Sequence, residues 1–244
     1  MNERRFPPFR LKRSVRALAA GSLAFGALMA AHAQTPTATR RAPAVVHDAR
    51  WQSSFDAFAA ADLARAPQAG GVVFVGSSSI RLWNDLEHTF QTQPPIVKRG
   101  FGGSRLSDCS SHLQRLVLPY KPRLVVIYAG DNDLAEGATP QQVLESFEAF
   151  VRGVRAELPD TRIAFVSIKP SPLRENLMTA AHAANALIEA YARGESNVDF
   201  VDVYSKMLGQ DGRPRTDLFG ADKLHLNEAG YALWKRELAA HLKL

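Results

Sequence analysis

Residues 72–80 read VVFVGSSSI, a continuous apolar run that ends in a turn of one glycine and three serines. A run without polar alternation is typical of a parallel strand that is buried on both faces of a sheet. Four more short apolar runs follow, at residues 96–97, 124–128, 163–168 and 198–203. The five runs predict the strands of one central sheet.

Helical patterns separate these runs. The strongest covers residues 140–158, where apolar side chains recur at spacings of three and four, and where Thr139 and Gln142 are spaced as a capping box around Pro140. An earlier pattern carries Trp51, Phe55, Phe58 and Leu63, and a last one, beginning at Asn227, carries Tyr231, Trp234, Leu238 and Leu242. Alternating strands and helices predict an α/β fold with helices on both faces of a parallel sheet.

Polar residues follow several of the predicted strands, and in open parallel sheets ligands bind at the carboxyl ends of the strands. The segments are GSSS at 76–79, GFGGS at 100–104 and GDND at 130–133, with DKLH at 222–225 just before the last helix. Each segment alone is equally typical of a helix cap or a turn. We therefore consider what the four segments could do together.

Together they contain the groups that acyl transfer requires. A serine at a strand-to-helix turn can act as the nucleophile, and His225 can take its proton. Asp222, three residues earlier in the same loop, can hold the imidazole tautomer. The N–H of the serine, the N–H of a glycine and the Asn132 amide can stabilise an oxyanion.

The order of these segments resembles the SGNH/GDSL hydrolase superfamily, in its lysophospholipase and platelet-activating-factor-acetylhydrolase-like branch. The similarity spans about residues 72–242 and is carried by VVFVGSSSIRLW, KRGFGGSRLSD, LVVIYAGDNDL and DKLHLNEAGY. It implies a three-layer α/β/α flavodoxin-like sandwich around a central, mostly parallel five-stranded sheet. It also implies a serine esterase that forms an acyl-enzyme and uses no metal and no cofactor.

The resemblance assigns a role to each matching position. It implies Ser78 as the nucleophile, with Asp222 and His225 as the other members of a catalytic triad. It implies an oxyanion hole made by the Ser78 N–H, the Gly103 N–H and the Asn132 side chain. Asp131 and Asp133 are read as turn or cap residues.

The chain departs from the family at one position. Relatives usually read Gly-Asp-Ser, whereas Ser77 here stands in place of the aspartate. We expect Ser77 to accept an N–H at the start of the following helix, as an N-cap serine does. The three adjacent serines leave Ser77 and Ser79 as alternative nucleophiles.

The N-terminus has the pattern of an export signal. Residues 1–16 carry six basic side chains, residues 17–31 carry no charge, and Ala31-His32-Ala33 fits a signal-peptidase site. We expect a signal peptide at 1–33, a flexible leader at 34–50, a hydrolase domain at 51–244, and a periplasmic or secreted protein without a stable membrane anchor. An uncleaved anchor is the alternative, although the apolar run is shorter than the roughly 20 residues of a membrane span. The choice between Sec and twin-arginine export is open.

The charge and the cysteine content exclude several kinds of partner and site. The whole chain of 244 residues has a net charge of +6, but residues 34–244 hold 24 basic and 23 acidic side chains, a net charge of +1. The sequence therefore contains no basic patch of the kind that would indicate nucleic-acid binding. The single cysteine, Cys109, excludes an internal disulfide and a cysteine-based zinc site, and we expect it to be a packing residue.

Other reaction classes fit less well. The sequence has no His-Glu-x-x-His motif for a metal hydrolase, no complete dinucleotide-binding glycine pattern and no Gly-x-Ser-x-Gly elbow. A glycan- or lipid-binding module and an acyltransferase with the same triad stay as alternatives. The expected partner is a small-molecule ester: a short-chain acyl ester, a lysophospholipid or an acetylated sugar. The sequence does not predict the oligomeric state.

Overall fold

A computed structural model describes residues 49–90, 92 and 94–242. The predicted signal peptide and all but the last two residues of the predicted leader lie outside the described residues, so both stay predictions. Within the described ranges, no helix is long and apolar enough to cross a membrane.

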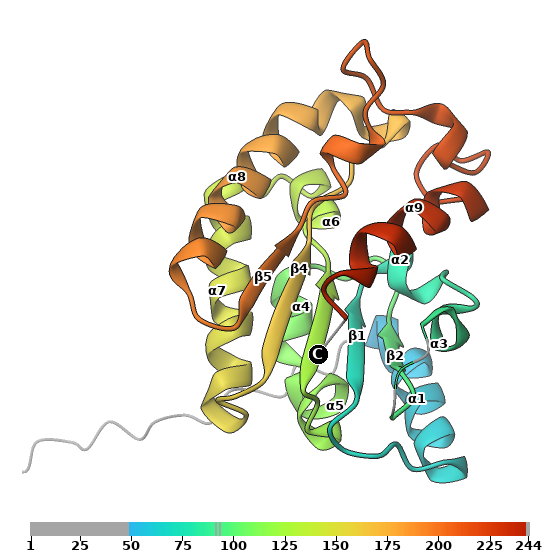
Figure 1. The fold of residues 1–244 in the computed structure, drawn as a ribbon, viewed down its shortest axis with the longest axis vertical. Coiled ribbons are helices and arrows are strands. Elements are labelled where there is room, and N and C mark those ends of the chain that lie inside the picture. Colours follow the sequence, from blue (N-terminus) through green and yellow to red (C-terminus); the bar gives the residue numbers. More distant parts are fainter. Residues whose placement is uncertain (1–48, 91, 93, 243–244) are drawn as a thin grey trace, which may run out of the picture. The chain divides into compact units, whose positions relative to one another are not determined.

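The centre of the domain is a five-stranded, fully parallel sheet with the strand order β2-β1-β3-β4-β5 (Figure 1). The strands are β1 (Val72–Gly76), β2 (Val97–Gly100), β3 (Leu124–Tyr128), β4 (Arg162–Val166) and β5 (Val198–Val201). Gly76 at the end of β1 is level with Gly100 on one side and Tyr128 on the other. The loops after these three strands therefore begin next to one another. This order is that of the flavodoxin-like doubly wound fold, so the predicted fold class is confirmed.

Three strands end two or more residues away from the ends of their apolar runs. β2 extends to Gly100 through Lys98 and Arg99, because both charged side chains find partners there: Lys98 donates to the Trp83 carbonyl, and the buried Arg99 bonds Tyr120 and Asp62. β4 ends at Val166 although its run continues, since the Asn185 side chain bonds both the N–H and the carbonyl of Ile168. β5 ends at Val201, and the chain turns away from the sheet there, where the Ser167 hydroxyl accepts the backbone N–H groups of Val203 and Tyr204.

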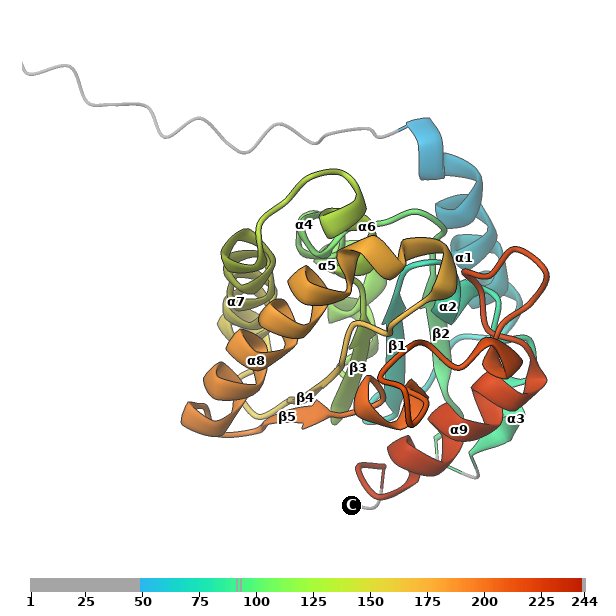
Figure 2. The ribbon, with the colours of Figure 1, turned by 90° about the horizontal axis from the view of Figure 1, so that it is seen from above.

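Helices cover both faces of the sheet, as the view from above shows (Figure 2). They are α1 (Gln52–Ala64), α2 (Ser78–Arg81), α3 (Leu86–Thr89), α4 (Leu106–Ser111), α5 (Leu113–Leu116), α6 (Asp131–Ala135), α7 (Pro140–Glu157), α8 (Met178–Gly194) and α9 (Glu228–Ala239). Short 3-10 helices lie at Ala49–Trp51, Leu118–Tyr120, Pro172–Leu177, Ser205–Met207 and Thr216–Leu218. The helices α1, α4, α5, α6, α7 and α8 contribute to the core on one face, and α2, α3 and α9 to the core on the other.

The predicted capping box of α7 is confirmed, and Asn227, where the last helical pattern begins, is the N-cap residue of α9. Thr139 and Gln142 form the predicted capping box of α7. Asn227 caps α9 by accepting the N–H of Gly230. The pattern of α1 is only partly correct, because Leu63 lies on its solvent side and is 90% exposed. In that helix Phe55 faces the core, while Leu63 does not.

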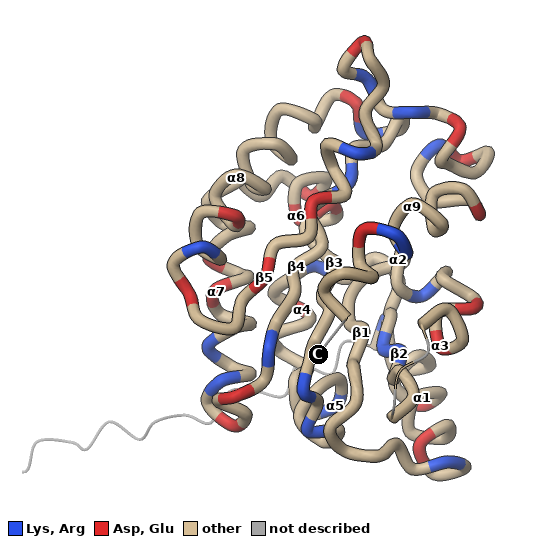
Figure 3. Tube along the Cα trace, viewed as in Figure 1, with Lys and Arg blue, Asp and Glu red and all other residues tan. Residues whose placement is uncertain are grey.

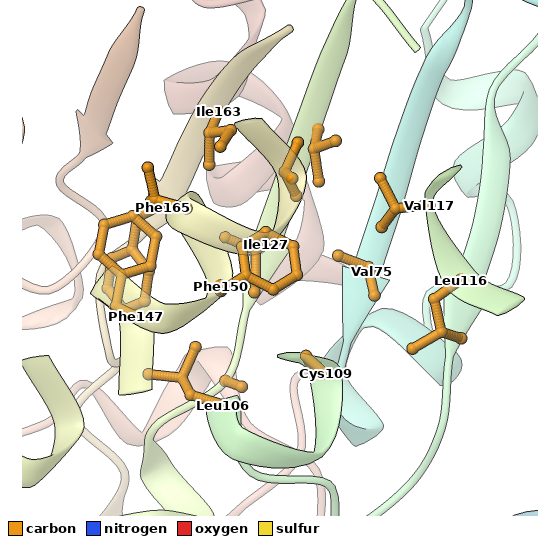
Figure 4. Close-up of a cluster of buried hydrophobic side chains, with 14 of the residues drawn as sticks. Val75, Leu106, Cys109, Leu116, Val117, Ile127, Phe147, Phe150, Ile163 and Phe165 are labelled. Carbon is orange, nitrogen blue, oxygen red and sulfur yellow. The ribbon is translucent and has the colours of Figure 1, made fainter. Parts of the chain in front are cut away.

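The core is divided by the sheet. Val73 and Val75 of β1 pack on one face, whereas Val72 and Phe74 pack on the other, so every second residue serves the same layer. Figure 4 shows part of the first layer, where Cys109 lies among valine, leucine and phenylalanine side chains. Cys109 is fully buried and unpaired, which confirms it as a packing residue.

Charged residues lie mostly on helices and loops around this core. Figure 3 shows basic and acidic residues interspersed along the described trace. Neither sign forms one long continuous stretch of that trace.

Candidate active site

The turn after β1 brings three serines to the carboxyl end of the sheet. It begins at Gly76, which has a φ of +138°, and a Cβ there would lie 1.9 Å from the carbonyl oxygen of Tyr128. Only glycine permits this approach between the end of β1 and the end of β3. The N–H of Ser77 donates to the same Tyr128 carbonyl at 2.9 Å, and α2 begins at Ser78.

Only one of the three serines contacts the predicted base. The Ser78 Oγ lies 2.9 Å from His225 Nε2. Ser77 and Ser79 are fully buried, and their hydroxyls have no hydrogen-bond partner among the described residues. The prediction that Ser77 accepts an N–H of the helix is wrong: Ser77 is the N-cap residue, but its hydroxyl is buried and makes no cap hydrogen bond.

His225 and Asp222 come from one tight loop before α9. His225 Nδ1 lies 2.6 Å from one carboxylate oxygen of Asp222. The other oxygen accepts the backbone N–H groups of Leu224, at 3.0 Å, and of His225, at 2.9 Å. The loop thus fixes the carboxylate, and the carboxylate fixes the ring. This arrangement assigns the proton to Nδ1 and leaves Nε2 as an acceptor toward Ser78.

These contacts keep Asp222 ionised. The hydrogen bond from His225 is the main cause that lowers the pKa of Asp222 well below its usual range, and the two backbone N–H groups add to it. The side chain of Asp222 is 51% exposed and that of His225 is 28% exposed. The pair is therefore held by directed hydrogen bonds at an open surface rather than by burial.

The loop after β2 presents Gly103. Gly103 has a φ of +76°, and a Cβ there would meet nothing within 4 Å. Trp51 Nε1 donates to the carbonyl of the preceding residue, Gly102, at 2.8 Å and so holds the loop in place. Within the described part of the chain, neither the Gly103 N–H nor the Ser78 N–H donates a backbone hydrogen bond. Both are available to a ligand.

Asn132 lies in α6, directly after β3, and is buried. Its Nδ2 donates to the Ser104 carbonyl at 3.1 Å, which joins α6 to the loop that carries Gly103. Its Oδ1 accepts from Arg174 Nη2 at 3.0 Å. The structure thus brings all five predicted site residues to one end of the sheet, and their catalytic roles stay predictions.

The neighbours of Asn132 have different roles. Asp133 caps the adjacent helix α4, since both of its carboxylate oxygens lie 3.2 Å from the N–H of Leu106. Asp131 is not a turn or cap residue; it forms ion pairs with Lys169 and Arg174. Neither cation was predicted from the sequence. A lysine placed directly after an apolar run, at 163–168, was the available signal.

Asp133 should make the stability of the domain depend on pH. Burial is the main cause that raises the pKa of Asp133 to about 6, despite the N–H of Leu106. Compared with an unfolded value near 4, this favours the folded state at low pH by about 3 kcal/mol, and the gain is lost as the pH rises, mostly between pH 4 and pH 7.

The replacement Asp133→Asn should remove this dependence, because an amide oxygen still accepts the Leu106 N–H and does not ionise. Urea unfolding of both proteins at pH 4, 5.5 and 7 measures it. We expect the free energy of unfolding of the wild type to fall relative to Asp133→Asn as the pH rises. Parallel curves would show that Asp133 is ionised in the folded state throughout this range.

Other candidate regions do not join the site. Trp83, Phe101 and Tyr128, which could have lined an acyl pocket, are buried core residues. A cavity of about 700 Å³ lies between α1 and the region of α3 and β2, and its lining contains none of the five predicted site residues.

The fold is similar to that of known proteins, and the chain matches one protein family. Residues 68–233, which include all five site residues, match the GDSL-like Lipase/Acylhydrolase family. A candidate platelet activating factor from Streptococcus pneumonia has a similar structure, with 22% identity, a TM-score of 0.69 and coverage of 80% of this chain and 93% of that one.

Two further solved structures are similar to the same extent. A GDSL-like lipase from Bacteroides thetaiotaomicron has 23% identity, a TM-score of 0.65 and coverage of 78% of this chain and 97% of its own. A candidate acylhydrolase from Bacteroides fragilis has 21% identity, a TM-score of 0.66 and coverage of 80% and 95%. No curated protein matches the chain. At these identities the solved structures show the fold.

Proposed function

Because the chain belongs to the GDSL-like lipase/acylhydrolase family, whose members hydrolyse esters, we propose that it cleaves carboxylic esters through an acyl-enzyme on Ser78. The observation that carries this proposal is the continuous hydrogen-bonded chain from Ser78 through His225 to Asp222. A nucleophile, a base and an orienting carboxylate in this order are what acyl transfer by serine requires.

In the acylation step, Ser78 Oγ attacks the ester carbonyl carbon while His225 Nε2 takes the hydroxyl proton. The carbonyl π bond breaks, and its electron pair moves to the oxygen. The resulting imidazolium is stabilised by the Asp222 carboxylate at Nδ1. When the tetrahedral intermediate collapses, the alkoxide leaves with the proton from Nε2, and the acyl group stays on Ser78.

Deacylation repeats these steps with water. His225 Nε2 takes a proton from a water molecule, whose oxygen attacks the acyl-enzyme carbonyl. Collapse of the second tetrahedral intermediate returns the proton to Ser78 and releases the acid. In both intermediates the oxyanion is stabilised by the N–H groups of Ser78 and Gly103 and by the Asn132 amide, the donors assigned to it above.

Short acyl esters are the substrates that the surroundings of the triad favour. Asp222 and His225 are partly exposed, which indicates an open site rather than a deep tunnel. Among the described residues, Leu173 is the large, exposed apolar side chain next to the catalytic loop; it is 58% exposed, and its N–H donates to the Lys223 carbonyl. A single leucine can cover a few methylene groups, but not a long acyl chain.

A series of p-nitrophenyl esters from acetate to palmitate tests the proposed function. We expect kcat/KM to be highest between acetate and butyrate and to fall by at least about 10-fold for palmitate, since a longer chain loses conformational freedom against the protein without gaining further apolar contact. An optimum at long chains would contradict the proposed short-chain preference. A folded protein without turnover on any ester would favour the binding module. Product formation that needs an added sugar or alcohol acceptor would favour an acyltransferase.

A further inference from the structure

A buried ion-pair cluster lies behind the predicted oxyanion donor. It consists of Tyr128, Asp131, Lys169 and Arg174. Lys169 follows β4, and the side chain of Lys169 is 1% exposed. Its Nζ lies 3.0 Å from Tyr128 Oη and 3.1 Å from Asp131 Oδ2. Tyr128, Asp131 and Lys169 are buried, whereas the Arg174 side chain is 21% exposed. The buried charges require compensating partners, because an unpaired buried charge is costly.

Arg174 connects this cluster to Asn132. It lies in the 3-10 helix Pro172–Leu177, and its Nη1 is 3.2 Å from the Asp131 carboxylate oxygen that also contacts Lys169. Its Nη2 donates to Asn132 Oδ1 at 3.0 Å. One guanidinium thus touches both the buried carboxylate and the amide, and the carboxylate holds the guanidinium in place.

The guanidinium decides how the Asn132 amide is oriented. Arg174 has only donors, so the amide atom that faces it must be the oxygen. Nδ2 then faces the Ser104 carbonyl and donates one of its two hydrogens to it, at 3.1 Å. Its second hydrogen is left for a ligand. The opposite orientation would place amide donors against guanidinium donors and the amide oxygen against the Ser104 carbonyl.

The cluster also carries an excess positive charge. Burial opposes the ionisation of Asp131, but Lys169 and Arg174 lower its pKa below the usual value. Burial and the charge of Asp131 raise the pKa of Tyr128 well above the usual value, so the phenol is neutral. Two cations and one carboxylate therefore leave one net positive charge next to the amide.

We propose that Arg174 is a positioning residue of the oxyanion hole, which holds the Asn132 amide so that Nδ2 serves the developing oxyanion. The positive charge that contacts Oδ1 polarises the amide and makes Nδ2 a better donor at the moment when negative charge appears on the substrate oxygen. Asp131 and Lys169 act one step further away, by fixing Arg174. This inference rests on the proposed function, since it assumes an oxyanion.

Steady-state hydrolysis of p-nitrophenyl acetate by the full chain tests this role. Arg174→Met removes the charge and the donors but keeps most of the length of the side chain. We expect kcat to fall roughly 10- to 100-fold, the range typical of a hydrogen bond to a charged group, with KM changed by less than about 2-fold. In an Asn132→Ala background, the same replacement should change kcat by less than about 2-fold, because the group that Arg174 positions is gone.

Two further variants separate this role from a structural one. Arg213→Met is the matched control, because Arg213 is an exposed arginine that pairs with Glu175 of the same 3-10 helix, and it should leave kcat unchanged. Arg174→Lys keeps the charge beside Asp131 but cannot bridge the carboxylate and the amide together, so its kcat should lie between the wild type and Arg174→Met. If Arg174→Met does not fold, Arg174→Lys can be compared in the wild-type and Asn132→Ala backgrounds instead.

Three results would overturn the inference. An equal loss of kcat with and without Asn132 would mean that Arg174 acts independently of the amide. A raised KM with unchanged kcat would mean that it binds the ground-state substrate. Unchanged kinetics of a folded Arg174→Met would exclude any role. An active Ser78→Ala would instead refute the proposed function, so the two failures are distinguishable.

Discussion

Ser78→Ala is expected to lower kcat for ester hydrolysis by on the order of 10³- to 10⁶-fold, the range found when the nucleophile of a serine hydrolase is removed. Ser78 Oγ is the hydroxyl of the three-serine turn that contacts His225 Nε2. Without it no acyl-enzyme forms, and the residual rate comes from substrate binding and oxyanion stabilisation alone. The measurement is kcat on p-nitrophenyl acetate, with the free energy of unfolding compared in parallel.

Ser79→Ala is the matched control for this loss. The Ser79 hydroxyl is buried without a partner among the described residues, so its removal leaves no polar group unsatisfied. We expect its activity to stay within a few-fold of the wild type, and both variants to change stability by less than about 1 kcal/mol. If Ser78→Ala were fully active and either Ser77→Ala or Ser79→Ala lost activity, that neighbouring serine would be the nucleophile instead.

The predictable part of the fold was the part that depends on local pattern. The unbroken apolar runs at 72–75 and 124–128 correspond to strands at the centre of the sheet, where both faces are buried. The edge strand β2 was placed too early and too short. Lys98 and Arg99 interrupt its apolar character, and the side chains that allow Arg99 to be buried there, Asp62 and Tyr120, are far from it in the sequence.

The site residues could be proposed from their places after strands and before the last helix, because a parallel sheet gathers those segments at one end. The residues that hold these site residues in place could not be predicted in this way. Trp51 reaches Gly102, and Arg174 reaches Asn132, across 51 and 42 residues of sequence. Neither contact follows from periodicity or spacing. The position of Lys169 after an apolar run could have marked the lysine, but its pairing with Asp131 depends on the pairing of β3 with β4 and does not follow from the sequence.

Asn132→Ala is expected to lower kcat by on the order of 10²- to 10³-fold with a much smaller change in KM. The variant lacks the amide that contacts the negatively charged oxygen of the transition state. The neutral ester loses little, because it carries no such charge. The Ser78 and Gly103 N–H groups should sustain the remaining rate. Pre-steady-state and steady-state rates on p-nitrophenyl acetate separate acylation from deacylation, and both should slow, because both pass through an oxyanion.

Asn132→Asp distinguishes a donor from a spacer. A carboxylate has nearly the shape of the amide and can keep the contact with Arg174, but when ionised it only accepts hydrogen bonds. It would therefore present negative charge to the oxyanion, and we expect its kcat to be no higher than that of Asn132→Ala. If Asn132→Asp instead retained nearly full activity, the shape of the side chain would be what matters and the oxyanion would be stabilised by the backbone alone. A loss in Asn132→Ala that appears only in KM would likewise place the amide against the ground-state substrate, outside the oxyanion hole.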